Sequence, residues 1–184
     1  MMQKKVQIIS DGSLDLSQEL TKEKDIEVVP FYVSFDSETY QKEMVEVGVR
    51  EFYQEMVDHP TVFPKTSMPS VHDYYEVFEK HAKEKMPVIC ICITKKFSGS
   101  LQSATTAKDM ILEEYPDAQI TVIDSTVNTV LQGLYVLEAC RLRDMGLEYQ
   151  QIVDALLPIR ETGRIFFTIG SIDYLKHGGR IGRL

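Results

Sequence analysis

A short loop carries two hydroxyl side chains around a glycine, in the stretch K-F-S-G-S-L at residues 96–101. Ser98 and Ser100 offer hydroxyl donors, and Gly99 lets a ligand approach the backbone closely. The loop follows the apolar run V-I-C-I-C-I-T and precedes residues with helical spacing, so the unpaired N–H groups of a helix start should lie beside these hydroxyls. This combination favours a bound anion, which the helix dipole stabilises by roughly 0.3–1 kcal/mol.

Two further loops at predicted strand ends carry hydroxyl and carboxyl groups. S-D-G-S contains Asp11 and Ser13, and D-S-T contains Asp124 and Ser125. In an open parallel sheet, the loops at the carboxyl ends of the strands converge on the ligand. Each loop alone has a simpler explanation, because Ser, Asp and Gly are also common turn and cap residues. Together they predict a polar site at this edge, with Phe97 either lining it or packing in the core.

A fourth hydroxyl cluster lies in K-T-S-M-P-S, residues 65–70. Ser70 is predicted to cap the following helix, because Asp73 stands three residues later as in a capping box. Thr66 and Ser67 lie further upstream, where capping does not require them. These two hydroxyls are therefore additional candidates for ligand contact.

The sequence lacks the signatures of several catalytic classes. It contains neither G-x-x-x-x-G-K-[ST], which binds nucleoside triphosphates, nor G-x-S-x-G, which carries a hydrolase nucleophile. Cys90 and Cys92 alternate along one predicted strand, and we interpret them as reduced, buried thiols rather than metal ligands. No metal or other cofactor is predicted. The histidines lack metal-ligand spacing and are expected on the surface; they are His59, His72, His81 and His177.

The charge balance and hydropathy exclude two kinds of partner. Twenty Lys and Arg against twenty-eight Asp and Glu give a net charge of −8, and no basic stripe indicates nucleic-acid binding. No apolar run approaches the ~20 residues of a membrane span, and the N-terminus has no signal-peptide core. We therefore expect a cytoplasmic protein without stable membrane insertion.

Strands and helices alternate along the chain, which predicts a doubly wound α/β fold. The run from Val88 to Thr94 lacks polar alternation, as is typical of a strand covered on both faces of a parallel sheet. Pro30 indicates that the second strand lies near a sheet edge, because proline cannot donate to the ladder. Strands are expected at 5–9, 28–35, 88–94, 118–124 and 164–169, and helices at 17–24, 49–57, 71–85, 101–111, 130–145 and 149–161.

The C-terminal part predicts a domain boundary. The long helix is expected to stop at Gly146, so residues 1–146 should form an N-terminal α/β domain. Residues 147–184 should begin a second α/β domain that is incomplete, because Y-L-K-H-G-G-R-I-G-R-L ends just after a glycine-rich turn.

Several segments, in order along the chain, resemble one family. They are S-D-G-S-L-D-L-S, K-T-S-M-P-S, F-S-G-S-L-Q-S-A, V-I-D-S and Y-L-K-H-G-G-R-I-G. Each motif alone is weak, but the ordered set spans nearly the whole chain and resembles the DegV family of bacterial fatty-acid-binding proteins. The resemblance implies two α/β domains with a long-chain fatty acid buried between them. The residues it implies for the carboxylate are Thr66, Ser67, Ser98, Gly99 and Ser100, with nearby backbone amides.

The resemblance also implies a partner. Members of the family present the acid to a separate fatty acid kinase, which forms acyl phosphate for phospholipid synthesis, while the binding protein itself phosphorylates nothing. Arg180 corresponds to a position on the side that faces the kinase. An enzyme remains the alternative: a hydrolase or transferase could use the same hydroxyl-rich loops on a small phosphorylated or acylated substrate, with Asp11 or Asp124 as its base.

Overall fold

The computed structural model describes residues 6–166, 168 and 172–179. By its internal contacts the chain divides into two compact units, one of residues 1–29 and 69–164 and the other of residues 30–68 and 165–184. The domain boundary expected at residue 147 stays a prediction.

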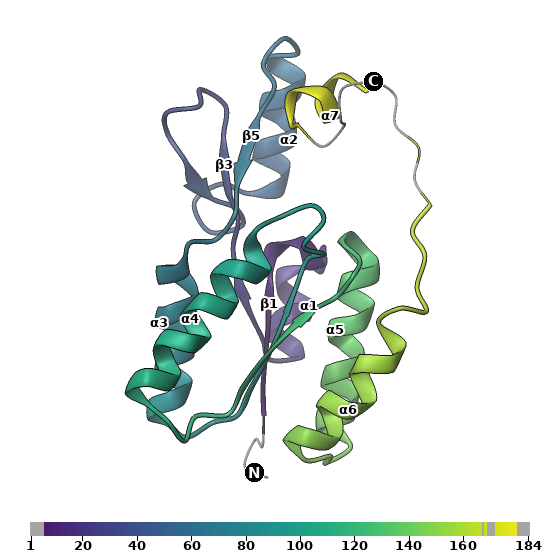
Figure 1. Ribbon diagram of the computed structural model, residues 1–184. Helices are drawn as coiled ribbons and strands as arrows, with labels where there is room; N and C mark the ends of the chain where they lie inside the picture. The colour runs from purple at the N-terminus through teal and green to yellow at the C-terminus, as the bar shows by residue number, and fades with distance from the viewer. Residues whose placement is uncertain (1–5, 167, 169–171, 180–184) are drawn as a thin grey trace. The chain divides into compact units, whose positions relative to one another are not determined.

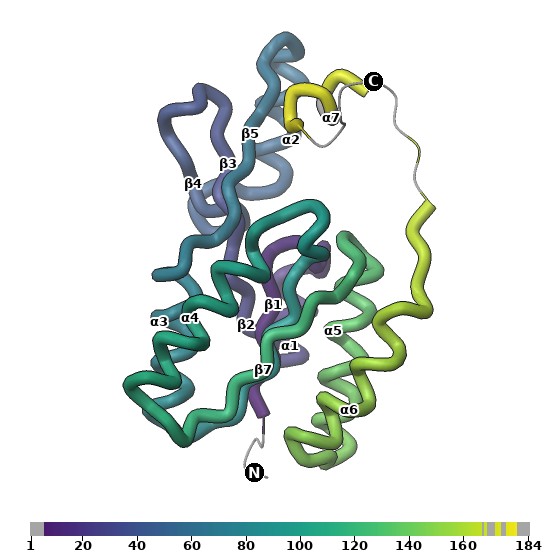
Figure 2. Tube along the Cα trace, in the orientation of Figure 1, coloured from purple at the N-terminus to yellow at the C-terminus, as the bar shows by residue number. Residues whose placement is uncertain are grey.

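The first unit is built on a four-stranded, wholly parallel sheet with strand order β2-β1-β6-β7 (Figures 1 and 2). Ile8 of β1 pairs with Ile26 on one side and Ile89 on the other, so β1 lies inside the sheet. The expected parallel α/β architecture is confirmed. The strands are β1 (Gln7–Asp11), β2 (Ile26–Val29), β6 (Val88–Cys92) and β7 (Ile120–Asp124).

Helices cover both faces of this sheet. Figure 1 shows α3 and α4 on one side of β1 and α5 and α6 on the other. The five helices predicted for this unit are confirmed, with ends that differ by a few residues. They are α1 (Gln18–Glu23), α3 (Val71–Lys83), α4 (Ser100–Glu114), α5 (Thr129–Asp144) and α6 (Tyr149–Ile159), and a 3-10 helix, η1 (Gly12–Leu14), follows β1.

Side chains of the strands belong to two separate apolar clusters, one on each face of the parallel sheet. Ile8 points into the cluster with α5 and α6, and its neighbour Ile9 points into the cluster with α3 and α4. Cys90 and Cys92 belong to the second cluster and are buried free thiols, as predicted. Within the described part of the chain, no group of three His, Cys, Asp or Glu side chains is placed to hold a metal ion.

Helix α3 begins with the capping box that the sequence predicts. Asp73 N–H donates to Ser70 Oγ at 3.1 Å and Ser70 N–H donates to the Asp73 carboxylate at 2.8 Å, which completes the capping box.

The exposure predicted for His81 is wrong. This side chain was expected on the surface, but it is only 5% exposed. It lies on the buried side of α3, where its Nε2 is 2.6 Å from Glu27 Oε2 on the edge strand β2. His59, His72 and His177 are exposed, as predicted.

The second unit contains an antiparallel sheet that the sequence did not predict. The expected strand at 28–35 is divided at Pro30: β2 pairs in the parallel sheet, whereas the residues after the proline form β3 in the other sheet. Proline fixes its own φ and lacks an N–H, which interrupts the ladder. The order is β4-β3-β5, with β3 (Tyr32–Ser34), β4 (Gln41–Lys42), β5 (Lys65–Ser67), α2 (Val49–Asp58) and α7 (Asp173–His177).

The strand expected at residues 164–169 is wrong for the residues that the structure describes there. Residues 164–166 and 168 are not in a strand, and Phe166 is 93% exposed. The apolar run has high β-propensity, but propensity alone does not supply a neighbouring strand. Ile169 lies outside the described residues, as does Lys5 at the start of the first predicted strand. Among the described residues, no helix is long and apolar enough to cross a bilayer.

Candidate functional site

A buried carboxylate stands at the carboxyl end of β1. Asp11 is 0% exposed. Its Oδ1 accepts hydrogen bonds from Gln132 Nε2 at 2.8 Å and from Ser13 N–H at 3.3 Å. Its Oδ2 accepts from Ser100 Oγ at 2.7 Å and from Ile93 N–H at 2.9 Å. These four donors compensate for the loss of water around the carboxylate.

A chain of buried hydrogen bonds connects side chains of α3 and β6 to this carboxylate. Since Ser100 gives its single hydroxyl proton to Asp11, the Tyr74 hydroxyl, 2.6 Å away, must donate to Ser100 Oγ. Cys92 Sγ lies 3.7 Å from the Tyr74 oxygen, and Cys90 Sγ lies 3.8 Å from Cys92 Sγ. The contacts form one directed chain from the strand thiols to Asp11.

Burial sets the protonation behaviour of this chain. Loss of water raises the pKa of Asp11, and the hydrogen bonds from Ser100 and Gln132 lower it again in part. Burial also raises the pKa of Tyr74 well above its ordinary value, with the neighbouring Cys92 and Asp11 acting in the same direction. Tyr74 is therefore a neutral hydrogen-bond donor at physiological pH.

The loop from Ser98 to Ser100 presents its two hydroxyls differently. Ser100, the first residue of α4, is fully buried, whereas Ser98 is half-buried and the N-cap residue Gly99 is exposed. Ser98 Oγ accepts from Ser100 N–H at 3.1 Å. The Ser98 hydroxyl proton has no acceptor among the described residues. Phe97, just before the loop, is 44% exposed.

The three predicted strand-end loops of the first unit do converge. Asp11 after β1 accepts from Ile93 N–H after β6. Ser125 N–H after β7 donates to Cys92 O at 3.0 Å, and Thr94 N–H donates to Val127 O at 3.0 Å. Hydrogen bonds therefore join each loop to the next along the carboxyl edge of the sheet.

Within the third loop, the predicted side chains stabilise their own turn. Asp124 Oδ1 accepts from Thr126 N–H at 2.9 Å. Ser125 is 0% exposed and its hydroxyl donates to Val127 O at 2.9 Å. Both contacts are typical of turn-forming side chains.

The other predicted hydroxyls belong to the second unit. Thr66 and Ser67 lie on β5, where they pair with Val33 and Tyr32 of β3 and have exposed side chains. Arg180 lies outside the described residues.

Two members of the buried network were not predicted from the sequence. Tyr74 lies in the helix predicted at residues 71–85 but was not singled out, because a hydroxyl partner 26 residues away leaves no local signal. Gln132 did leave one: it shares a helix face with the buried residues Tyr135, Val136 and Ala139, and a polar side chain on such a face needs a buried partner.

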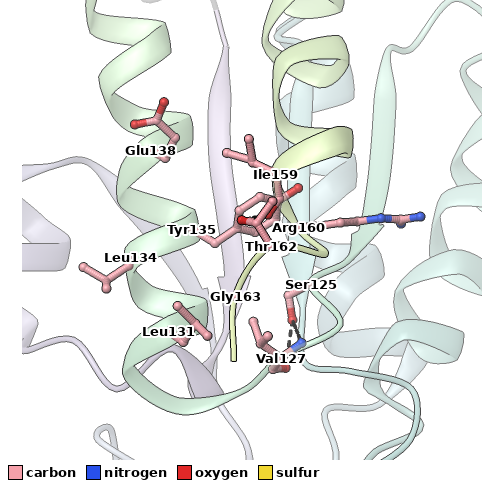
Figure 3. Close-up of a pocket in the computed structure, with 10 residues that line it drawn as sticks. All are labelled: Ser125, Val127, Leu131, Leu134, Tyr135, Glu138, Ile159, Arg160, Thr162 and Gly163. Carbon is pink, nitrogen blue, oxygen red and sulfur yellow. Dashed lines mark hydrogen bonds between the residues drawn. The ribbon is translucent and has the colours of Figure 1, made fainter. Parts of the chain in front are cut away.

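A small pocket lies elsewhere in the first unit, between α5 and the end of α6 (Figure 3). Leu131, Leu134 and Tyr135 line the pocket from α5. The Tyr135 hydroxyl donates to Leu156 O at 2.8 Å. In Figure 3 the Arg160 side chain points away from these leucines. The volume of about 180 Å³ is below the roughly 300–1,000 Å³ of ordinary ligand pockets.

The comparison with protein families decides the relationship. The model of the DegV family, described as "Uncharacterised protein, DegV family", matches residues 5–184. The chain belongs to the DegV family. A DegV domain-containing protein of Clostridium perfringens is 31% identical over 177 residues, which cover 96% of this chain and 62% of that protein.

Solved DegV structures share the fold. A stearic-acid-binding protein from Eubacterium ventriosum has a TM-score of 0.92 and 48% identity, covering 96% of this chain and 60% of that one. A DegV family protein from Thermus thermophilus, described for its fatty acid binding, has a TM-score of 0.80 and 30% identity, covering 97% of this chain and 61% of that one. The chain thus spans about three fifths of the length of these relatives.

Proposed function

We propose that this DegV chain takes part in binding one long-chain fatty acid, between two domains in a protein of the length of its relatives. The observation that carries the proposal is the 48% identity and TM-score of 0.92 shared with the stearic-acid-binding protein over 96% of this chain. The family resemblance gives Thr66, Ser67, Ser98, Gly99 and Ser100 as the residues around the carboxylate, with the backbone amides at the start of α4, and Ser98 is the hydroxyl donor that we propose from the first unit.

The free Ser98 proton supports the head-group contact. A hydroxyl that already accepts one hydrogen bond and retains its own proton is suited to donate to a carboxylate. The affinity comes mainly from the tail: at ~0.8 kcal/mol per buried CH₂, about fourteen methylenes contribute on the order of 11 kcal/mol before association costs. The head group therefore orients the ligand more than it retains it.

We further propose that the bound acid is presented to a fatty acid kinase in the cytoplasm. In that reaction an oxygen of the acyl carboxylate attacks the γ-phosphorus of ATP, ADP leaves, and the product is acyl phosphate for phospholipid synthesis. This chain supplies the acid, and the kinase supplies the nucleotide site. The absence of a phosphate-binding G-x-x-x-x-G-K-[ST] sequence in residues 1–184 is in keeping with this division.

The enzyme alternative has little support from Asp11, one of the two residues that it could use as a base. A general base must reach its substrate within hydrogen-bond distance. Asp11 is fully buried and its two oxygens already accept four hydrogen bonds. We therefore propose no catalytic role for Asp11.

The test is native mass spectrometry of this chain within a protein of the length of its relatives, purified without detergent, before and after addition of stearic acid. We expect a mass increment equal to one long-chain fatty acid. Ser98→Ala should weaken binding about tenfold, the effect of losing roughly 1.4 kcal/mol of a charge-assisted hydrogen bond. Thr106→Ala is the matched control, because it removes a hydroxyl from α4, the helix that follows the Ser98–Ser100 loop, at an exposed contact with Gln102. A protein that carries no acid and binds none when stearate is added would overturn the proposal.

A further inference from the structure

We infer that Asp11 is a positioning residue whose buried carboxylate fixes the Ser98–Ser100 loop, so that Ser98, and not Ser100, presents a hydroxyl proton to the bound acid. The inference rests on the proposed function, because it concerns how the same head-group site is held. It gives different roles to Ser98 and Ser100, which the sequence motif alone does not distinguish.

The hydroxyl of Ser100 is fully committed inside the protein. It donates to Asp11 Oδ2 at 2.7 Å and receives the Tyr74 hydroxyl at 2.6 Å. The residue is 0% exposed. A ligand carboxylate needs a donor, and Ser100 has one side-chain proton, which Asp11 already holds. Ser100 therefore serves the protein's own loop.

Ser98 has the opposite arrangement. Its oxygen accepts from Ser100 N–H at 3.1 Å, and its proton has no acceptor within the described part of the chain. The direction of that proton depends on the backbone between Ser98 and Ser100. Fixing Ser100 therefore fixes the donor that Ser98 offers.

One oxygen of Asp11 contacts both ends of the segment at residues 93–100, which contains the Ser98–Ser100 loop. Oδ2 accepts from Ile93 N–H, where the chain leaves β6, and from Ser100, where α4 begins. Gln132 and Ser13 hold the other oxygen and so fix the orientation of the carboxylate. A displacement of about 1 Å at a site of this kind is enough to weaken a directed contact strongly.

The experiment compares stearate and methyl stearate binding by Asp11→Asn and Ser100→Ala. In Asp11→Asn, an NH₂ group replaces one oxygen, so two donors face another donor; Ser100→Ala removes the loop contact and leaves Asp11 with three donors. We expect each variant to bind stearate about tenfold more weakly, with methyl stearate unaffected, because the ester lacks the charged head group. Ile111→Val, a buried change further along α4, is the control for lower stability with unchanged stearate affinity.

Two further readouts separate positioning from general stability. Backbone amide hydrogen exchange of residues 94–101 in the ligand-free variants should be faster, while exchange of β7 stays unchanged. In a Ser98→Ala background, Asp11→Asn should cause little further loss of stearate affinity, because both changes remove the same contact.

The outcomes distinguish this inference from the proposed function. Unchanged stearate affinity and unchanged loop exchange in both variants would overturn the positioning role, as would independent, multiplying losses in the double variant. If wild-type protein binds no stearate but Asp11→Asn still accelerates exchange at residues 94–101, the proposed function fails and the loop-fixing role of Asp11 is supported.

Discussion

The two sheets hold their candidate hydroxyl groups in different ways. In the parallel sheet, every residue of β1 and β6 is buried, and the Ser98–Ser100 loop is joined to a carboxylate in the core. In the antiparallel sheet, all three residues of β5 are exposed, and main-chain pairing with β3 places Thr66 and Ser67. Changes near the first group should therefore alter stability and binding together, whereas changes in the second group should separate them.

The largest effect is expected in the parallel sheet. Ile89→Ala removes a side chain that is 0% exposed on the strand between β1 and β7. We expect the free energy of unfolding to fall by about 2–5 kcal/mol, because the cavity cannot collapse fully. Urea unfolding measures this, and a loss below about 1 kcal/mol would contradict the view of this sheet as the well-packed core.

Gly133→Ala should have the next largest effect. A Cβ added at Gly133 in α5 would clash with Leu14 O and would lie 2.8 Å from Leu16 Cδ2. The gain of up to ~1 kcal/mol in helix propensity should be outweighed, for a net loss of about 1–3 kcal/mol in unfolding free energy. Thermal unfolding measures whether Gly133→Ala lowers or raises stability. A higher melting temperature would contradict the prediction and would show that η1 can move aside at little cost.

The edge strand β2 gives a smaller, pH-dependent effect. Burial raises the pKa of Glu27, but hydrogen bonds from His81 and Lys80 outweigh it and leave the pKa below its ordinary value. A lowered folded-state pKa stabilises the protein above the unfolded-state pKa of about 4.3, and this contribution is lost as the pH falls through the folded value.

Glu27→Gln should therefore destabilise the protein most near neutral pH, and the difference from wild type should shrink in acid. Urea unfolding across the acid range measures it. Glu76→Gln is the control, since its partner His72 is exposed. A difference between Glu27→Gln and wild type that does not change with pH would count against the lowered pKa.

The smallest stability effect is expected on β5. Thr66→Ala should change the free energy of unfolding by no more than about 0.5 kcal/mol, because the side chain is exposed. If Thr66 contacts the carboxylate, the same variant should retain less stearate after gel filtration. A large loss of stability in Thr66→Ala would contradict the view that changes on β5 affect binding without affecting stability.

The sequence predicted most of the parallel sheet because its signals are local. The unbroken apolar run at Val88–Cys92 and the Ser70–Asp73 capping box each require a few neighbouring residues, and both are confirmed. The antiparallel sheet was missed because β4 and β5 have only two and three residues, respectively, and no apolar alternation. Residues 164–166 give the opposite case: their run has the β-propensity of a strand, but they are not in one, because local propensity does not supply a neighbouring strand.

The site was predicted in its parts and not in its connections. Asp11 and Ser100 were both identified as ligand candidates, yet the structure joins them to each other at 2.7 Å across 89 residues of chain. Residue type and local spacing indicate where polar groups gather. They do not indicate which groups satisfy one another, because that depends on helix packing over both faces of the sheet.

The buried chain from Cys92 through Tyr74 and Ser100 to Asp11 also has a sense of direction. Each hydroxyl owns one proton, so all must point the same way along the line. If Asp11 took up a proton on Oδ2, it would become the donor to Ser100, which would donate to Tyr74, which would donate to Cys92. A single added proton on Oδ2 would thus reverse the direction of every hydrogen bond from Asp11 to Cys92, because each of these groups has only one proton to donate.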